Sequence, residues 1–332
     1  MNKKLVLGLS GGVDSAVAAK LLLNEGYEVF GLYLDIAGEA SREDAKAAAE
    51  NLGIPLEIAD ISAALEEKVC RPFVEAYLRG ETPNPCVLCN PNVKFKTLLE
   101  YADIICADFI STGHYARVSD GRLFKGEPDN DQSYMLCRLK KEQLERLKLP
   151  LGDYNKLEVR KLAEGFGLPA AHKAASMEIC FIPDKDYGAY IEARGIVPPE
   201  GNFVDENGKV LGRHRGIHRY TVGQRRGLNI AAAKRIFVSE IRPDTNEVVL
   251  SDGEELFVNK IGVMDVNWLV PKDDKFEAEV RVRHSKLSFP AIVEPTESGA
   301  QVIFKAPVRA PTKGQSAVFY IGEEVIGGGF IV

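Results

Sequence analysis

The sequence predicts an α/β protein with an N-terminal doubly wound parallel sheet, followed by a small β-rich part and a C-terminal β-barrel. Within the first 115 residues, short β-rich runs alternate with helical patterns, at 4–9, 13–24, 28–34 and 41–52. Such alternation is typical of parallel strands joined by crossover helices. The stretch 201–227 is rich in glycine, arginine and turn signals, and strand-like runs dominate from Phe237 onward, at a spacing that suits a small antiparallel barrel.

The remaining elements follow from the same patterns. Further strands are expected at 56–59 and 108–112, and helices at 62–79, 95–105, 140–147 and 157–166. Ser41, followed three positions later by Asp44, predicts a capping box at the start of the second helix. In the C-terminal half, strands are expected at 247–250, 276–283, 291–293, 301–304, 317–321 and 325–331. We therefore expect three domains, at 1–188, 189–252 and 253–332.

Length and composition narrow the class of protein. A chain of 332 residues exceeds the roughly 100–200 residues of a usual domain, and its 45% apolar and 27% charged residues are close to the average of folded proteins. The apolar run 5–9 is too short for a signal sequence or a membrane span, so we expect a cytoplasmic protein. Six cysteines in such a chain argue against a disulfide scaffold and leave burial, catalysis or metal binding.

Charge is unevenly distributed along the chain. The net charge of −6 argues against binding nucleic acid over the whole surface. The stretch 209–239 nevertheless contains eight basic residues and no acidic one: Lys209, Arg213, Arg215, Arg219, Arg225, Arg226, Lys234 and Arg235. Such a stretch can bind phosphates, and it can also be an ordinary solvated face.

A glycine-rich loop follows the first expected strand. Strand 4–9 leads into Ser10-Gly11-Gly12-Val13-Asp14-Ser15, and a helix starts at once. This arrangement places free backbone N–H groups at a helix N-terminus above the sheet edge, where phosphates bind. The loop lacks the Gly-Lys-Ser/Thr ending of a Walker loop and the spacing of a dinucleotide fingerprint. A tight turn without a ligand is the alternative.

The loop resembles the pyrophosphatase loop (PP-loop) of enzymes that split ATP between the α and β phosphates. The resemblance implies that the backbone amides and the hydroxyls of Ser10 and Ser15 hold pyrophosphate, and that Asp14 helps to position Mg²⁺. It implies ATP contacts from ten residues: Gly8, Leu9, Ser10, Gly11, Gly12, Val13, Asp14, Ser15, Leu34 and Gly113. Several enzyme classes share this loop, so it predicts a reaction class, with ATP and Mg²⁺ as cofactors, and leaves the substrate open.

Two cysteine-bearing segments carry a more specific resemblance. The run 82–90 (Thr-Pro-Asn-Pro-Cys-Val-Leu-Cys-Asn), followed by Lys94-Phe95, and the run 176–182 (Ser-Met-Glu-Ile-Cys-Phe-Ile) are similar to the cysteine segments of bacterial tRNA 2-thiouridylases, the MnmA family. The strings 113–116 (Gly-His-Tyr-Ala), 129–134 (Asp-Asn-Asp-Gln-Ser-Tyr) and 220–228 (Tyr-Thr-Val-Gly-Gln-Arg-Arg-Gly-Leu) also match. The resemblance extends over the whole chain and implies ATP-dependent formation of 2-thiouridine at the wobble position, 34, of tRNA.

The chemistry of this product explains why thiols are needed. A uridine 2-carbonyl is urea-like, so it is a poor electrophile with a poor leaving group, and adenylylation of its oxygen corrects both faults. By resemblance, Cys180 carries the incoming sulfur as a persulfide, and Cys89 is the catalytic thiol that releases it and can form a disulfide with Cys180. Cys70, Cys106 and Cys137 are expected to be ordinary buried side chains.

One position departs from the usual family pattern. Many members have Asp where this chain has Cys86, so a proton-transfer role at this position is in doubt. Cys86, Cys89 and Cys180 could instead hold an iron–sulfur cluster, such as 4Fe-4S, whose open iron binds and delivers sulfide. The cluster and the persulfide remain equal alternatives. A zinc site ranks lower, because it usually needs four ligands and no second Cys-x-x-Cys or paired His is present.

The resemblance also implies tRNA contacts and partners. A wobble uridine has to be flipped to reach the thiols, which requires polar groups at the base edge and cations at the flanking phosphates. The residues implied are Asn84, His114, Asn130, Asp131, Gln132, Arg283, His284 and Gln315. The partners implied are the tRNAs for lysine, glutamate and glutamine, and a sulfur donor, either a cysteine desulfurase or a persulfide relay protein.

Three other functions stay open at the level of sequence. A ligase that adenylylates a carboxylate or carbonyl for attack by an amine or ammonia would share the loop and have no use for Cys89 and Cys180. Sulfur transfer to a different tRNA nucleoside would be distinguished only by its product. A non-catalytic RNA-binding protein with a vestigial loop is the third, although Ser10, Asp14 and Ser15 are all present.

Overall fold

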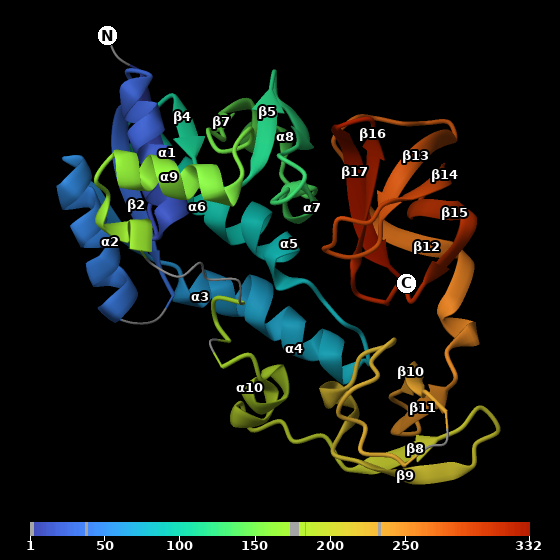
Figure 1. Ribbon diagram of the computed structural model, residues 1–332. Coiled ribbons are helices and arrows are strands. Elements are labelled where there is room, and N and C mark those ends of the chain that lie inside the picture. Colours follow the sequence, from blue (N-terminus) through green and yellow to red (C-terminus); the bar gives the residue numbers. More distant parts are fainter. Residues whose placement is uncertain (1–2, 37–38, 173–178, 183, 232–233) are drawn as a thin grey trace.

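The computed structural model describes residues 3–36, 39–172, 179–182, 184–231 and 234–332, and it has three parts along the chain (Figure 1). The N-terminal part contains a sheet of order β3-β2-β1-β4-β7, in which all neighbours are parallel. The predicted parallel sheet is therefore confirmed. Its strands are β1 (Lys4–Gly8), β2 (Glu28–Asp35), β3 (Leu56–Asp60), β4 (Phe109–Ser111) and β7 (Leu147–Lys148).

Helices, two of them π-helical turns, and one hairpin complete the N-terminal part. None of the helices in the described part of the chain is long and apolar enough to cross a membrane. The helices are α1 (Val13–Asn24), α2 (Glu39–Leu52), α3 (Ser62–Leu65), η1 (Glu66–Cys70), α4 (Arg71–Leu78), α5 (Pro85–Cys89), η2 (Asn90–Lys94), α6 (Phe95–Ile104), α7 (Ser133–Leu136), α8 (Lys141–Glu145), α9 (Lys156–Gly165), η3 (Pro169–His172) and α10 (Tyr187–Ala193). The hairpin is formed by β5 (Ala116–Ser119) and β6 (Arg122–Lys125).

Strand β1 lies at the centre of the sheet and is buried on both faces. Leu5 and Leu7 pack in the core that includes α1 and α9, whereas Val6 packs in the core that includes α6. Alternate side chains of a strand point to opposite faces, so a continuous apolar run is what a strand covered on both sides requires. The strand order reverses at β1, because β2 pairs on one side and β4 on the other. Open α/β sheets bind ligands at such a switch point.

The central and C-terminal parts are built from strands. The central sheet has the order β10-β11-β8-β9, and six strands close a C-terminal barrel, because β12 pairs with both β15 and β17. The predicted barrel is therefore confirmed. The central elements are β8 (Gly201–Val204), β9 (Val210–His214), η4 (Ile217–Arg219), β10 (Phe237–Arg242), β11 (Glu247–Ser251) and η5 (Glu254–Leu256). The barrel strands are β12 (Phe257–Trp268), β13 (Phe276–Arg281), β14 (Phe289–Thr296), β15 (Gly299–Arg309), β16 (Ser316–Ile321) and β17 (Glu324–Ile331).

Some local expectations were wrong. Helix α2 begins at Glu39, so Ser41 lies in its first turn and not at its cap; glutamate and alanine at 39–40 are good helix formers and extend the helix upstream. The helix expected at 140–147 ends at Glu145, and Leu147 belongs to β7.

Cysteine burial and several strands also differ from expectation. Cys70 and Cys137 are buried as expected, but Cys106 is exposed, in the turn that follows α6. Strands β5, β6 and β12 were missed. In β12, polar and charged residues such as Lys260 and Asp265 interrupt the apolar pattern, because they lie on the outer face of the barrel.

The hairpin β5–β6 attaches the N-terminal part to the barrel. Strand β6 pairs with β17, with Phe124 opposite Glu324. Close by, Asp131 forms a buried ion pair of 2.5 Å with Arg281 of β13, and its carboxylate accepts hydrogen bonds from the N–H and hydroxyl groups of Ser133 at 3.0 Å each. A buried pair of this kind is costly to break from one side, so it fixes the barrel against the N-terminal part.

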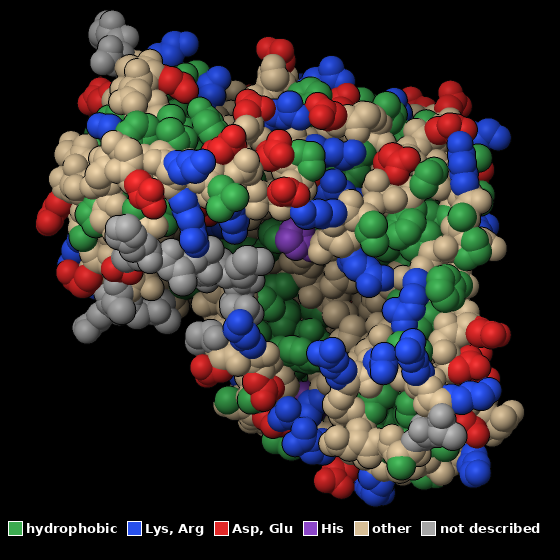
Figure 2. All heavy atoms as spheres, in the orientation of Figure 1, with side chains coloured by type: hydrophobic (Ala, Val, Ile, Leu, Met, Phe, Trp, Pro, Cys, Tyr) green, Lys and Arg blue, Asp and Glu red, His purple; other side chains and the backbone are tan. Residues whose placement is uncertain are grey.

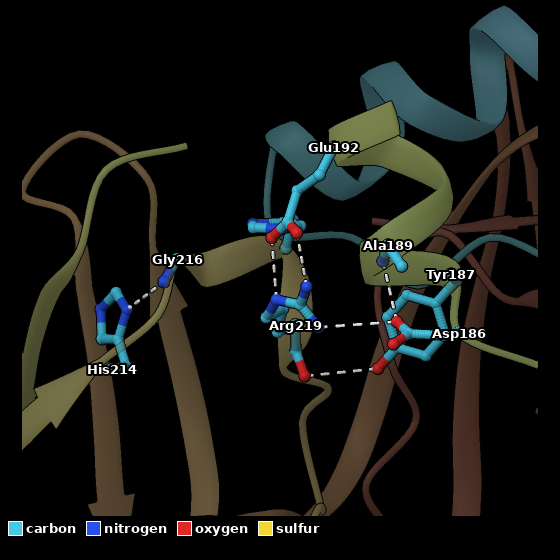
Figure 3. Close-up of polar contacts among 8 residues, drawn as sticks. Asp186, Tyr187, Ala189, Glu192, His214, Gly216 and Arg219 are labelled. Carbon is cyan, nitrogen blue, oxygen red and sulfur yellow. Dashed lines mark hydrogen bonds and ion pairs between the residues drawn. The ribbon is translucent and has the colours of Figure 1, made fainter. Parts of the chain in front are cut away.

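Helix α10 attaches the central sheet to the N-terminal part (Figure 3). The carboxylate of Glu192 accepts two hydrogen bonds from Arg219, at 2.9 and 2.6 Å, and lies 3.0 Å from Nε2 of the fully buried His218. Asp186 forms a second ion pair with Arg219, at 3.5 Å. The Arg219 guanidinium lowers the pKa of the Glu192 carboxyl. Ile191 of the same helix packs against residues of α4.

Replacing Asp131 with Asn is expected to lower the free energy of unfolding by about 3–5 kcal/mol, because Arg281 becomes an uncompensated buried charge. Urea unfolding followed by the fluorescence of Trp268, the single tryptophan of the chain, reports on the barrel core and measures this loss. Lys286→Met is the control. Its partner Asp129 is exposed, so a loss below about 1 kcal/mol is expected. Equal losses in both variants would contradict the fixing role of the buried pair.

Candidate active site

Two adjoining cavities open at the carboxyl edge of the N-terminal sheet. The small cavity has a volume of about 330 Å³ and lies where β1 and β4 end, at the switch point. The large cavity, of about 720 Å³, lies between the N-terminal part and the barrel, in the hollow visible in Figure 2. Residues that line both cavities are Cys89, Lys94, His114, Gln132 and Cys180. The cavities therefore meet at these side chains.

The loop after β1 is held by its own hydroxyls and by a glycine. The Oγ atoms of Ser10 and Ser15 lie 3.2 Å apart, and the Ser15 hydroxyl donates to the carbonyl of Gly12 at 3.0 Å. Gly11 has φ +75°, and a Cβ there would lie 2.5 Å from the backbone of Asp44 in α2. Gly12 is the N-cap of α1, and no side chain caps this helix. The first N–H groups of α1 are thus left for an anion.

The segment after β4 contacts this loop directly. A Cβ on Gly113 would lie 2.8 Å from the carbonyl carbon of Asp14 and 2.9 Å from the nitrogen of Ser15, so a side chain cannot be accommodated there. Tyr115 donates a hydrogen bond of 2.5 Å to Oδ1 of Asp14. Burial and this carboxylate raise the pKa of Tyr115, which stays a donor at all working pH values. Tyr115 belongs to one of the sequence strings that match the family, but the sequence alone predicted no role for it.

Most of the expected ATP contacts line the small cavity. Those that line it are Gly8, Leu9, Ser10, Asp14, Ser15, Leu34 and Gly113, whereas Gly11, Gly12 and Val13 do not. Gly11 instead allows α2 to pack on the loop, and Val13 begins α1. An apolar wall that sequence reasoning missed completes the cavity, formed by Leu32, Tyr33, Ile36, Ile61 and Leu65. Such a wall suits the flat face of an adenine base.

A cap and a π-helical turn position the first two cysteines. Oδ1 of Asn84 accepts a hydrogen bond of 3.1 Å from the N–H of Cys86 and so caps α5. The helix then widens into the π turn η2, where Pro91 has no N–H to donate. Cys89 and Lys94 lie at the two ends of this turn, and both side chains line the two cavities.

The three thiols of the site are free and protonated at neutral pH. Burial raises the pKa of Cys86 and of Cys89, and the cation of Lys94 opposes this shift in both. The surrounding protein atoms, together with Cys89 and Cys86, raise the pKa of Cys180 to about 11, although its side chain is exposed to solvent. Because the thiolate is the nucleophile, these thiols are unreactive until the charge around them changes.

The three thiols do not form a metal site as they are placed. All three thiols line the large cavity, and the ligands of a shared cluster have to converge on one space in this way. Within the described ranges, however, no three His, Cys, Asp or Glu side chains are grouped so that they could hold a metal ion. Part of the second cysteine segment, 176–178, lies outside the described residues.

The chain has clear relatives among known proteins. Residues 3–184 match the family described as tRNA methyl transferase HUP domain, 189–252 its PRC-barrel domain, and 258–331 the aminomethyltransferase beta-barrel domain. The chain is 44% identical over its whole length to the tRNA-specific 2-thiouridylase MnmA 1 of Clostridium tetani, of which it covers 97%. The chain belongs to the tRNA-specific 2-thiouridylase family. The family resemblance expected from the cysteine segments is thus confirmed.

A second member of the family is similarly related. The chain is 43% identical to the tRNA-specific 2-thiouridylase MnmA of Carboxydothermus hydrogenoformans, with 99% of this chain and 97% of the relative covered. Likeness to solved structures is weaker. The crystal structure of a 4-thiouridine synthetase–RNA complex with bound ATP is 18% identical, covers 58% of this chain and 50% of that chain, and gives a TM-score of 0.39.

The tRNA contacts implied by the 2-thiouridylase family all line the large cavity, and several also hold the framework. The residues are Asn84, His114, Asn130, Asp131, Gln132, Arg283, His284 and Gln315. Gln132 accepts a hydrogen bond from the N–H of Tyr115 at 3.0 Å through Oε1, and Gln315 donates to the carbonyl of Thr82 at 2.7 Å. Arg283 donates to the carbonyl of Arg309 at 2.6 Å. Both oxygens of Asp131 are engaged by protein groups, so its role in the structure is to shape the cavity.

His114 lies at the junction of the two cavities as a neutral side chain. Its Nδ1 is 2.7 Å from the hydroxyl of Thr112, and its ring lies 5.7 Å from that of Phe95. Burial, with a smaller contribution from Lys94, lowers its pKa well below the usual value. A neutral imidazole can donate or accept a hydrogen bond, but it adds no charge to the site.

The raised pKa of Cys180 predicts slow alkylation at neutral pH. The thiolate is the reacting form, so the rate with iodoacetamide is expected to rise about tenfold per pH unit from about pH 7 to 10, and to level off near the pKa of about 11. Mass spectrometry of the peptide that contains Cys180, after brief exposure at each pH, measures this profile. In urea-denatured protein the plateau is expected near the ordinary thiol pKa of about 8.5. Coinciding profiles of the folded and denatured chain would show that the site does not shift this thiol.

Proposed function

We propose that this protein catalyses the ATP-dependent 2-thiolation of uridine 34 of tRNA and forms 2-thiouridine. One observation carries the proposal: Cys89 and Cys180 form part of the wall between the small cavity, which the PP-loop enters, and the large cavity, which the implied tRNA contacts line. C2 of the uridine loses its oxygen to the nucleotide and gains a sulfur from a thiol. It therefore has to lie where the two cavities meet. A reaction that consumes tRNA and ATP also supports a cytoplasmic location.

The first step is the activation of the uridine. ATP would bind in the small cavity, with its β and γ phosphates at the N–H groups of α1 and at Ser10 and Ser15. Asp14 fits a role in holding Mg²⁺, because it lines the small cavity and Tyr115 fixes its carboxylate through Oδ1. Mg²⁺ would neutralise charge on the phosphates. The uridine 2-oxygen then forms a bond to the α phosphorus, and pyrophosphate leaves.

Sulfur transfer follows at the two thiols. The terminal sulfur of a Cys180 persulfide bonds to C2 of the adenylylated uridine, and the C2–O bond breaks to release AMP. The thiolate of Cys89 then attacks the inner sulfur of Cys180, which forms the Cys89–Cys180 disulfide and leaves the outer sulfur on C2 as 2-thiouridine. An external dithiol has to reduce the disulfide before the next turnover.

The large cavity supplies the contacts that a flipped base requires. With a volume of about 720 Å³ it has room for a nucleotide, and its lining includes basic side chains for flanking phosphates. The side-chain carbonyl oxygens of Asn84 and Gln132 accept hydrogen bonds within the protein. Their NH₂ groups would therefore be the groups that donate hydrogen bonds to the uridine. The exposed position of Cys180 suits delivery of sulfur by a cysteine desulfurase or a relay protein. The tRNAs for lysine, glutamate and glutamine are the expected substrates.

The test is nucleoside mass spectrometry of unmodified tRNA incubated with the protein, ATP, Mg²⁺ and a persulfide donor. The expected product is 2-thiouridine, and Cys89→Ser or Cys180→Ser is expected to lower its yield by at least about 10³-fold, because either change removes a sulfur that the transfer needs. Cys106→Ser is the matched control, since Cys106 is exposed and lies outside both cavities. Release of pyrophosphate without sulfur in any nucleoside, and without loss in the variants, would favour an amide ligase. Sulfur in another nucleoside would favour the related transfer reaction.

The iron content of the protein and the activity of a Cys86 variant distinguish the persulfide route of sulfur transfer from the cluster route. Among the described residues the three thiols are not grouped as metal ligands, which favours the persulfide route over the cluster. We expect protein purified without oxygen to contain no stoichiometric iron and to be active with a persulfide donor. Cys86→Ser is then expected to keep more than about a tenth of the activity, because Cys86 transfers no sulfur in this route. Stoichiometric iron that is lost together with activity in Cys86→Ser would establish the cluster route.

A further inference from the structure

The small cavity contains a single basic side chain among its described lining residues, and it is Lys94. The other charged group there is the carboxylate of Asp14. ATP bears about four negative charges at neutral pH, and the α phosphate changes its bonding in both steps of the proposed reaction. A cavity that holds this reaction needs a cation near the α phosphate, beyond the N–H groups that hold pyrophosphate.

Lys94 lies where the α phosphate has to be. Ser10 and Ser15 mark the pyrophosphate end of the small cavity, and Cys89 and Cys180 mark its border with the large cavity. The α phosphate is bonded to pyrophosphate before the first step and to the uridine oxygen after it, so it lies between these two ends. Lys94 lines both cavities, because the π turn η2 places it beside Cys89.

The ammonium of Lys94 also has no ion pair among the described residues, in contrast to two other cations nearby. In the large cavity Arg281 is paired with Asp131, and Lys286 with Asp129. No carboxylate of the described residues is within ion-pair distance of Lys94, and its side chain is half-buried at the wall of the site. A half-buried cation with no carboxylate partner among the described residues is a natural binding group for an anionic ligand.

We propose that Lys94 is a catalytic residue whose ammonium binds the α phosphate, first while the uridine oxygen displaces pyrophosphate and then while AMP leaves C2. This inference rests on the proposed function. The ammonium of Lys94 donates hydrogen bonds to the non-bridging oxygens, and no proton is transferred. In the first step the O–P bond to uridine forms as the P–O bond to pyrophosphate breaks. In the second, the C–S bond forms as the C–O bond breaks and AMP carries away the oxygen and its electron pair.

A different role for the same cation has to be separated from this one. Lys94 opposes the rise in the thiol pKa values, so it could act only by making the thiols more nucleophilic. In that case its loss would slow sulfur transfer and leave the activation of uridine unchanged. The two roles are distinguished when the activation step is measured in protein that lacks both thiols.

The experiment measures tRNA-dependent release of pyrophosphate in a single turnover, in the full-length Cys89→Ser/Cys180→Ser background, whose own rate is the reference. Adding Lys94→Met is expected to lower this rate by about 10²–10³-fold, the usual cost of removing one group that stabilises developing charge. Lys94→Arg is expected to recover at least about tenfold of it, because a guanidinium keeps the charge but not the point geometry. Lys96→Met is the control, since Lys96 is exposed on the neighbouring helix α6 and lines neither cavity.

The outcomes separate this proposal from the proposed function. A rate within about threefold of the reference in Lys94→Met, with tRNA binding and the circular dichroism spectrum unchanged, would overturn the role of Lys94. An equal loss in Lys94→Met and Lys96→Met would also overturn it, since general electrostatics would then explain the effect. If the protein with its native thiols releases no pyrophosphate in response to tRNA, the proposed function itself fails, whatever the variants do.

Discussion

The rest of the site depends on the close approach of two loops that end neighbouring strands. Parallel pairing brings the ends of β1 and β4 to one edge of the sheet, and Gly113 can lie against Asp14 and Ser15 because it has no side chain. Tyr115 then fixes Asp14 from the same segment. This contact holds the uncapped start of α1 beside the cavity, so its N–H groups are available to phosphates. A methyl group at position 113 would push α1 away from the site that it serves.

The second half of the site is made by contacts between parts that are far apart in the sequence. The large cavity exists because the barrel is fixed to the N-terminal part by the pairing of β6 with β17 and by the buried pair of Asp131 and Arg281. Residues that the family resemblance assigns to tRNA are therefore also residues that build the cavity. A residue can both build the cavity and contact tRNA where its side chain has two polar groups, as Gln132 does. The two roles conflict in Asp131, because both of its oxygens accept hydrogen bonds within the protein.

The sequence predicted what is encoded by neighbouring residues and missed what is encoded by distant ones. Helix α1 was predicted at its observed limits because the loop, the helix start and the apolar pattern are contiguous. The hairpin β5–β6 was missed because its edge is completed by a strand about 200 residues later, which no local pattern records. Lys94 was given no role from the sequence, because no local pattern showed that it ends a π turn at the wall of both cavities.

The position of the thiols in the shared wall of the two cavities also explains why they can stay protonated before the reaction starts. The carbon under attack carries the bond to AMP on one side and receives sulfur on the other, so it can react only when both cavities are filled at once. Until then burial keeps Cys86 and Cys89 as thiols and the surroundings do the same for Cys180, which limits oxidation and wasteful release of sulfur. A cation at the same wall interacts with the phosphate and the thiols together. Its position therefore couples the activation of the base to the transfer of the sulfur.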